Sequence, residues 1–153
     1  MYKIPVSVLV VIHTIDLQVL LLERTDHPNY WQSVTGSQDP GETLYQTAMR
    51  EVLEETGINA ADYSLTDWHV ENQYEIYEEW RWRYAPDVKI NTEHVFDLCL
   101  PGIAPVKIAA REHLNYIWLP WQQAAKQVFS SSNAGAILNL PVLCTNYLTK
   151  NNP

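Results

Sequence analysis

Residues 36–58 read GSQDPGETLYQTAMREVLEETGI, and this stretch decides the fold. Thr43 followed three residues later by Gln46 fits a capping box, in which each side chain satisfies a backbone amide at the start of a helix. Gly57 stands where a left-handed residue commonly ends a helix. Apolar residues at intervals of four give the segment a stripe to bury, namely Leu44, Ala48 and Val52. The sequence therefore predicts a helix over 43–56.

Three glutamates lie close together on this predicted helix. Glu51, Glu54 and Glu55 stand at positions i, i+3 and i+4, so their carboxylates share one face. Like charges at that spacing destabilise one another unless a cation lies among them, and hard carboxylate oxygens suit Mg²⁺. Arg50 can pair with Glu42 or Glu54 and hold that carboxylate in position. The helix is therefore a candidate metal site.

The plain alternative is that this helix only presents a charged face to solvent, as most helices of such composition do. The residues that flank the helix argue against that interpretation, namely Gly36, Glu42 and Gly57. A helix that only presents a charged face to solvent needs no glycine at either end. We therefore favour a functional cluster of carboxylates over a solvated surface.

Composition and charge describe one acidic globular chain. The 153 residues have the size of a single domain, expected to span 1–153, and 46% of them are hydrophobic. The formal net charge is -8 and the Lys and Arg residues are scattered, so we expect no nucleic-acid partner. Residues 6–12 are an apolar run too short to cross a bilayer, so we expect no membrane association. A polyanionic small molecule fits if metal ions offset its charge.

The cysteine content indicates a reducing compartment. Cys99 and Cys144 are the only cysteines, and neither belongs to a CxxC pair. Two cysteines do not make a disulfide framework, so we expect reduced thiols and a cytoplasmic protein.

Apolar runs and turn residues outline the remaining elements. Extended segments are expected over 6–12, 19–22, 31–35, 74–84, 93–100 and 116–119. Helices are expected over 121–129 and after Asn133, with Pro141 kinking or ending the last one. Within 74–84 three aromatic residues alternate with two arginines, a pattern typical of a strand with two different faces. Strands with interspersed helices and no strict βαβ repeat favour an α/β fold with a mixed sheet between helices.

The stretch from 36 to 58 resembles the signature of the Nudix family, Gly-x5-Glu-x7-Arg-Glu-U-x-Glu-Glu-x-Gly-U, with U apolar. The matching residues are Gly36, Glu42, Arg50, Glu51, Val52, Glu54, Glu55, Gly57 and Ile58. Seven of these positions demand one residue type, so the chance of a random match is roughly one in a million. The resemblance implies a Nudix-like α/β/α sandwich with a mixed sheet and a loop-helix-loop catalytic motif. It also implies a pyrophosphohydrolase that uses two or three Mg²⁺ ions, or Mn²⁺ in their place.

Further segments resemble a bacterial group of that family which acts on dihydroneopterin triphosphate. They are 31–37 (WQSVTGS), 83–86 (RYAP), 91–96 (NTEHVF) and 112–118 (EHLNYIW). This resemblance implies hydrolysis of 7,8-dihydroneopterin triphosphate to the monophosphate and pyrophosphate, a step towards folate. It also implies that a glutamate from a later loop, Glu112 in this chain, joins the metal site.

The same resemblance suggests roles for individual residues. Glu51 and Glu55 would be the principal metal ligands together with Glu112, while Glu54 or Glu112 would act as the general base. Candidate substrate contacts are Lys3, Arg24, Trp31, Gly36 and Arg83, although a solvated surface charge fits each of the basic residues equally well. Aromatic residues that could stack on a substrate ring, but that are better explained as core, are Trp31, Trp80, Trp82 and Tyr84.

Two other functions stay open at this stage. A nucleotide-sanitising (d)NTP pyrophosphohydrolase would carry the same signature, because the signature handles the pyrophosphate that both substrates share. A non-catalytic binding module of the same fold commonly loses a signature glutamate, whereas this chain keeps them all. A monomer and a homodimer are both compatible with the sequence.

Overall fold

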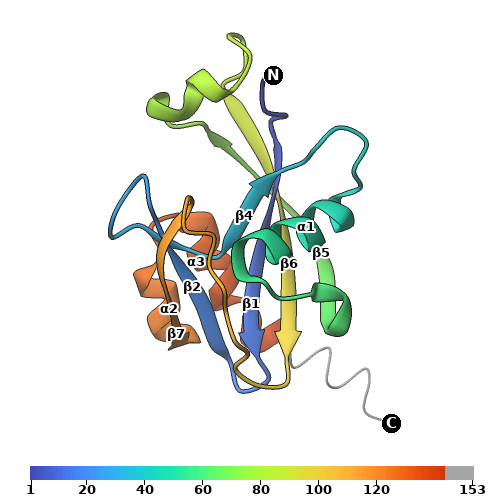
Figure 1. Cartoon of the computed structure of the whole chain (residues 1–153), viewed down its shortest axis with the longest axis vertical. Coiled ribbons are helices and arrows are strands. Elements are labelled where there is room, and N and C mark those ends of the chain that lie inside the picture. The colour runs from blue at the N-terminus through green and yellow to red at the C-terminus, as the bar shows by residue number, and fades with distance from the viewer. Residues whose placement is uncertain (144–153) are drawn as a thin grey trace.

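The computed structural model describes residues 1–143, and its centre is a mixed β-sheet (Figure 1). The strands are β1 Val6–Thr14, β2 Gln18–Arg24, β3 Trp31–Gln32, β4 Val34–Ser37, β5 Ser64–Glu75, β6 Ile90–Leu100 and β7 His113–Pro120. Their order is β3-β2-β1-β6-β5, with β4 paired to β1 and β7 paired to β2. β1 runs parallel to β6, whereas its pairings with β2 and β4 are antiparallel. The predicted mixed sheet is thereby confirmed.

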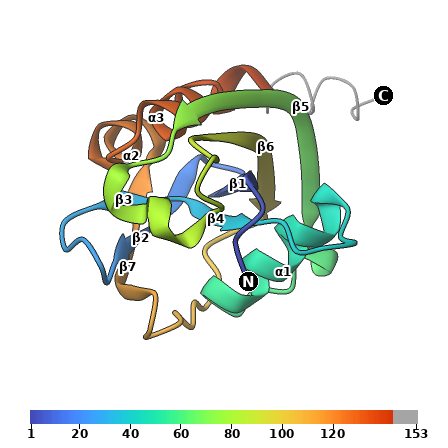
Figure 2. The ribbon, with the colours of Figure 1, turned by 90° about the horizontal axis from the view of Figure 1, so that it is seen from above.

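Helices cover both faces of this sheet. α1 (Leu44–Thr56) lies on one side, and α2 (Trp121–Gln127) and α3 (Ser131–Leu138) lie on the other, as the view from above shows (Figure 2). Two 3₁₀ helices complete the described elements, η1 (Ala60–Asp62) and η2 (Glu78–Arg83). The arrangement is an α/β/α sandwich, as expected.

The central strand β1 explains why both faces are covered. Its residues alternate between two separate apolar clusters: Val8 and Val10 face α1 together with Phe96, whereas Leu9 and Val11 face the other side. A strand buried on both faces has a continuous apolar run rather than an alternating one. This is why residues 6–12 were recognisable as a strand.

The predicted capping of α1 is present. The amide of Gln46 donates to Thr43 Oγ1 over 3.1 Å, and the amide of Thr43 donates to Gln46 Oε1 over 2.9 Å. At the other end Gly57 has φ 74° and its amide donates to the Leu53 carbonyl. Both ends of the helix are therefore fixed by its own sequence, which sets where its carboxylates point.

The expected strand over 74–84 is wrong beyond Glu75. Residues 78–83 form the 3₁₀ helix η2, in which the Trp80 amide donates to the Tyr77 carbonyl over 2.8 Å. The expectation that the aromatic residues here are core is also wrong, because neither apolar cluster contains them and Trp82 is 74% exposed. This segment is stabilised by local ring contacts, such as that of Tyr77 with Trp80, and not by cross-strand pairing. It projects beyond the end of the sheet (Figure 1).

Other boundaries differ by a few residues from those expected. The segment 31–35 is divided into β3 and β4, and β6 begins at Ile90 rather than at residue 93. α3 ends at Leu138, before Pro141. Cys99 lies half-buried in β6, and Cys144 is outside the described residues. None of the helices within 1–143 is both long and apolar enough to cross a membrane.

Candidate active site

The signature glycine Gly36 makes room for a signature glutamate. Gly36 lies in β4 opposite Val8 of β1, and the carboxylate of Glu51 from α1 rests against it. A Cβ added at Gly36 would lie 2.0 Å from Glu51 Cδ and 2.3 Å from each carboxylate oxygen. Only glycine leaves this space, so the spacing between Gly36 and Glu51 in the sequence reflects direct contact between strand and helix.

Glu51 and Glu55 form a buried pair of carboxylates. Their exposed fractions are 9% and 1%, and burial is the first cause of a raised pKa on both carboxyl groups. The Glu51 and Glu112 charges raise the pKa of Glu55 further. Glu55 Oε2 has no hydrogen-bond partner among residues 1–143. Arg50 offsets part of the charge on Glu51, but the unpartnered, buried Glu55 Oε2 fits a divalent cation, which would supply further positive charge.

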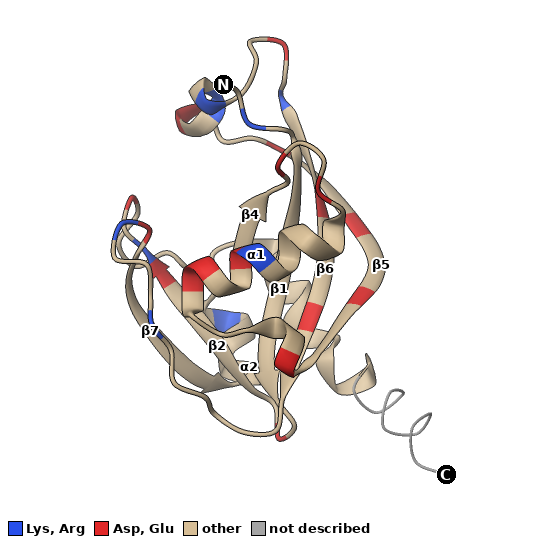
Figure 3. Ribbon diagram, turned by 45° about the vertical axis from the view of Figure 1, so that its right-hand side comes forward, with Lys and Arg blue, Asp and Glu red and all other residues tan. Residues whose placement is uncertain are grey.

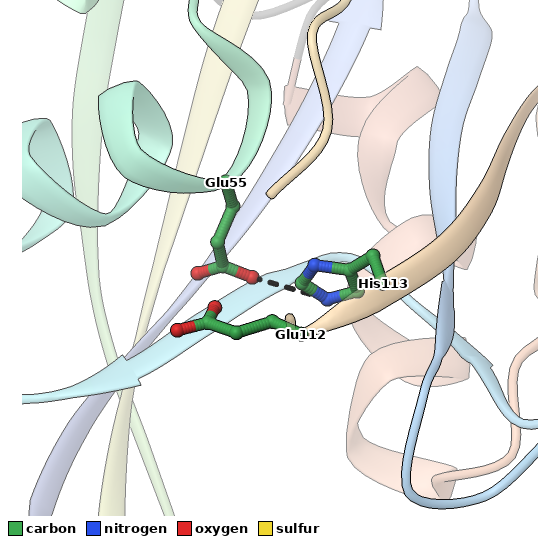
Figure 4. Close-up of side chains that lie close together, drawn as sticks. All are labelled: Glu55, Glu112 and His113. Atoms are coloured by element: carbon green, nitrogen blue, oxygen red, sulfur yellow. Dashed lines mark ion pairs between the residues drawn. The ribbon is translucent and has the colours of Figure 1, made fainter. Parts of the chain in front are cut away.

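His113, the first residue of β7, and Glu112, which precedes it, complete this cluster (Figure 4). One ligand atom from each of Glu55, Glu112 and His113 lies within 4.8 Å of the others. His113 Nε2 is 3.4 Å from Glu55 Oε1, and burial lowers the pKa of His113 to about 4, so its imidazole is neutral at neutral pH. Glu112 is exposed and belongs to the cleft wall. The proximity of Glu112 was expected, whereas that of His113 was not.

Arg50 links the helix to the loop that precedes it. Its Nε and Nη2 donate to both oxygens of Glu42 over 2.7 and 2.9 Å, and Nη2 also donates to the Ser37 carbonyl over 2.9 Å. Its Nη1 donates to Glu51 over 2.8 Å and lies 3.3 Å from Glu54. The guanidinium lowers the pKa of Glu42 to about 2. Arg50 therefore pairs with both predicted partners and also orients Glu51.

A cleft of about 1630 Å³ opens beside these carboxylates. Glu51, Glu55 and Glu112 line one part of it. Among the candidate substrate contacts, Lys3, Arg24, Gly36 and Arg83 also line the cleft. Figure 3 shows that the acidic bands on α1 stand next to a single basic band on that helix. The structure thus brings acidic and basic side chains to one cleft.

The basic residues of the cleft are held by neighbours. Arg24 donates two hydrogen bonds of 2.7 Å to Asp26, and its guanidinium lies 4.5 Å above the ring of Trp80. Arg83 lies 3.8 Å from the same Asp26. Burial, followed by the Arg83 charge, lowers the pKa of Lys3. Arg24 and Arg83 are therefore positioned by Asp26, whereas Lys3 is exposed and is linked to Arg83 through its backbone amide, which donates to the Arg83 carbonyl over 2.8 Å.

Three candidate residues do not line the cleft, namely Arg50, whose contacts are given above, Trp31 and Glu54. Trp31 packs against the apolar cluster on the α2 and α3 side of the sheet. Glu54 has a side chain that is 52% exposed and that contacts Arg50. Glu54 thus turns to solvent, whereas Glu51 and Glu55 are buried and line the cleft, so the expectation that all three carboxylates share one face is wrong for Glu54.

Comparison with known proteins identifies the class that this helix and its carboxylates define. The NUDIX domain model matches residues 3–139, and the chain belongs to the Nudix family. It is 48% identical over 139 residues to the dihydroneopterin triphosphate diphosphatase of Escherichia coli K12, covering 89% of this chain and 91% of that protein. The Haemophilus influenzae protein of the same name is 39% identical, covering 89% and 87%. The solved E. coli dihydroneopterin triphosphate pyrophosphohydrolase superposes with a TM-score of 0.86 at 45% identity, covering 94% of this chain and 99% of that one.

Proposed function

We propose that this protein hydrolyses 7,8-dihydroneopterin triphosphate to the monophosphate and pyrophosphate, a step towards folate. The observation that carries the proposal is its similarity, along 89% of the chain, to enzymes that bear the name of this activity. The products require cleavage of the anhydride between the α- and β-phosphates. The substrate is a small triphosphate, whose negative charge must be offset in an acidic protein.

The proposal assigns the metal ligands to the buried pair and its neighbour. Glu51 and Glu55 would bind Mg²⁺, or Mn²⁺ in its place, together with Glu112, and the open cleft leaves space for two or three ions. Support comes from the buried, unpartnered Glu55 Oε2 and from the ligand atoms gathered around it. When bound, the ions would neutralise charge on the phosphates and lower the pKa of the attacking water.

The general base in this proposal is Glu112 rather than Glu54. Glu112 lines the cleft and is exposed, so it can accept a proton from water that attacks the phosphate. Glu54 points to solvent and contacts Arg50. Arg50 would act by positioning, since its bonds to Glu42 and Glu51 fix the loop and the ligand at once.

Three cations beside the glutamates would bind the triphosphate. Lys3, Arg24 and Arg83 line the cleft, and two of them share Asp26, which keeps their guanidinium groups together. An arginine fork matches phosphate oxygens in geometry as well as charge. These residues are expected to affect KM for a triphosphate more than the chemical step.

A substrate panel tests the proposal. Pyrophosphate release would be measured for dihydroneopterin triphosphate, dATP, dGTP and oxidised dGTP, each with Mg²⁺ and with a chelator. We expect the pterin substrate to have the highest kcat/KM and all release to require the metal. A much higher kcat/KM for any nucleotide would transfer the assignment to nucleotide sanitation.

A further inference from the structure

Glu93 is a buried acid that the proposed hydrolysis does not use. It lies in β6 with an exposed fraction of 5%, and it lines the cleft. Its Oε1 atom is buried and has no hydrogen-bond partner among the described residues. A buried acceptor without a partner is costly, so it points to a ligand that donates hydrogen bonds.

The surroundings of Glu93 suit a flat ring rather than a phosphate chain. Its strand neighbour Val95 faces the same side of the sheet as Leu9, and both line the cleft. Trp68 lines the same part, and its indole donates to Asp97 over 2.8 Å, which fixes the ring. Apolar and aromatic walls with one placed polar group are typical of small-molecule sites.

Another polar side chain that lines this cleft, that of Asn133, already has hydrogen-bond partners. The side chain of Asn133 accepts from the Ser33 amide over 2.8 Å and donates to the Ser33 hydroxyl over 3.0 Å. Burial raises the pKa of Glu93, and hydrogen bonds from Ser132 and Asn72 offset this in part. The unpartnered Oε1 is therefore the part of this carboxyl group that stays available as a hydrogen-bond acceptor.

We propose that Glu93 recognises the edge of a 2-amino-4-oxopyrimidine ring, which carries a ring N–H beside an exocyclic amino group. This inference rests on the proposed function, because the pterin ring presents that edge. A carboxylate accepts the two parallel donors at once. Guanine presents the same pair of donors, whereas adenine and cytosine do not. Glu93 is thus a specificity-determining residue for the ring, acting at the opposite end of the substrate from the phosphates.

Two variants test this assignment. Glu93→Gln keeps the size of the side chain but places a donor in the site, while Glu71→Gln removes an exposed carboxylate on the neighbouring strand β5 and is the matched control. Since hydrogen bonds to a charged group are strong, we expect KM for dihydroneopterin triphosphate to rise about 10- to 100-fold in Glu93→Gln. Hydrolysis of inorganic tripolyphosphate, which has no ring, should match wild type in both variants. Unchanged KM in Glu93→Gln would overturn the inference.

A comparison of two nucleotides needs no variant. dGTP and dITP differ only in the 2-amino group, so the wild-type protein should prefer dGTP about tenfold or more, measured as kcat/KM or as inhibition constants. A ratio near one would overturn the inference even if Glu93→Gln failed to fold. If dGTP were a better substrate than the pterin triphosphate, the proposed function would be refuted. In that case a high ratio of kcat/KM for dGTP to that for dITP would still support the role of Glu93.

Discussion

Replacing Gly36 with alanine should remove activity while leaving the fold intact. The new Cβ would lie 2.0 Å from Glu51 Cδ, whereas carbon atoms in contact are separated by about 3.5–4.0 Å, so the carboxylate must retreat by roughly 1.5 Å. Misplacement of a reacting group by about 1 Å costs on the order of 100-fold in rate. We therefore expect kcat/KM to fall about 100-fold or more. The backbone is not strained, because Gly36 lies in β4 and its φ is not positive.

The matched control is Gly102→Ala, whose added Cβ would meet nothing within 4 Å. Both variants would be assayed for pyrophosphate release across a Mg²⁺ titration, and their thermal unfolding would be followed. The atom that must move is the end of a flexible side chain, so the Tm of Gly36→Ala should lie within about 4 °C of the control. If Gly36→Ala retained the activity of Gly102→Ala, the contact between strand and carboxylate would have no catalytic importance.

Three further variants test the charges around α1. In metal-free protein, Glu55→Gln should raise Tm by about 2–4 °C, since it removes a buried acid whose ionisation is disfavoured by burial and by Glu51. The variant should also lose the stabilisation by Mg²⁺ that we expect of wild type; an unchanged Mg²⁺ response would contradict this. Arg50→Lys should lower kcat/KM about 10- to 100-fold, because a single ammonium group cannot bond to both oxygens of Glu42 and also to Glu51. Full activity of this variant would show that the guanidinium group is dispensable. Arg50 depresses the pKa of Glu42 from 4.5 to about 2, so Glu42 stabilises the fold above pH 4.5 and this contribution is lost as the pH falls towards 2. The Tm difference between wild type and Glu42→Gln, measured without metal, should shrink over that range; a constant difference would exclude the linkage.

The parts of the site that the sequence could predict are those set by local geometry. Helix periodicity places Glu51 and Glu55 on one face, and the capping pair and Gly57 fix both helix ends. The bonds of Arg50 to Glu42 and Glu54 follow from their spacing along the same segment. Each of these relations joins residues within one turn or one adjoining loop, so no knowledge of the tertiary structure is needed.

The parts that sequence could not predict depend on contacts between distant segments. His113 reaches Glu55 only because β7 pairs with β2 and brings residue 113 opposite Arg24. Glu93 enters the cleft because β6 lies beside β1 and turns alternate residues to each face. The EHL run from Glu112 was the only available signal for His113. The aromatic segment 74–84 was misassigned because its alternation fits both a strand and a chain held by local ring contacts.

Direct measurement of cation binding tests the central claim that a buried pair of carboxylates recruits a divalent metal. Mn²⁺ would be titrated into wild type, a Glu51→Gln, Glu55→Gln double variant and the Glu71→Gln control, with free Mn²⁺ followed by electron paramagnetic resonance. We expect wild type and the control to bind Mn²⁺ that Mg²⁺ displaces, and the double variant to lose this binding. Equal Mn²⁺ affinity and stoichiometry in all three proteins would contradict the account.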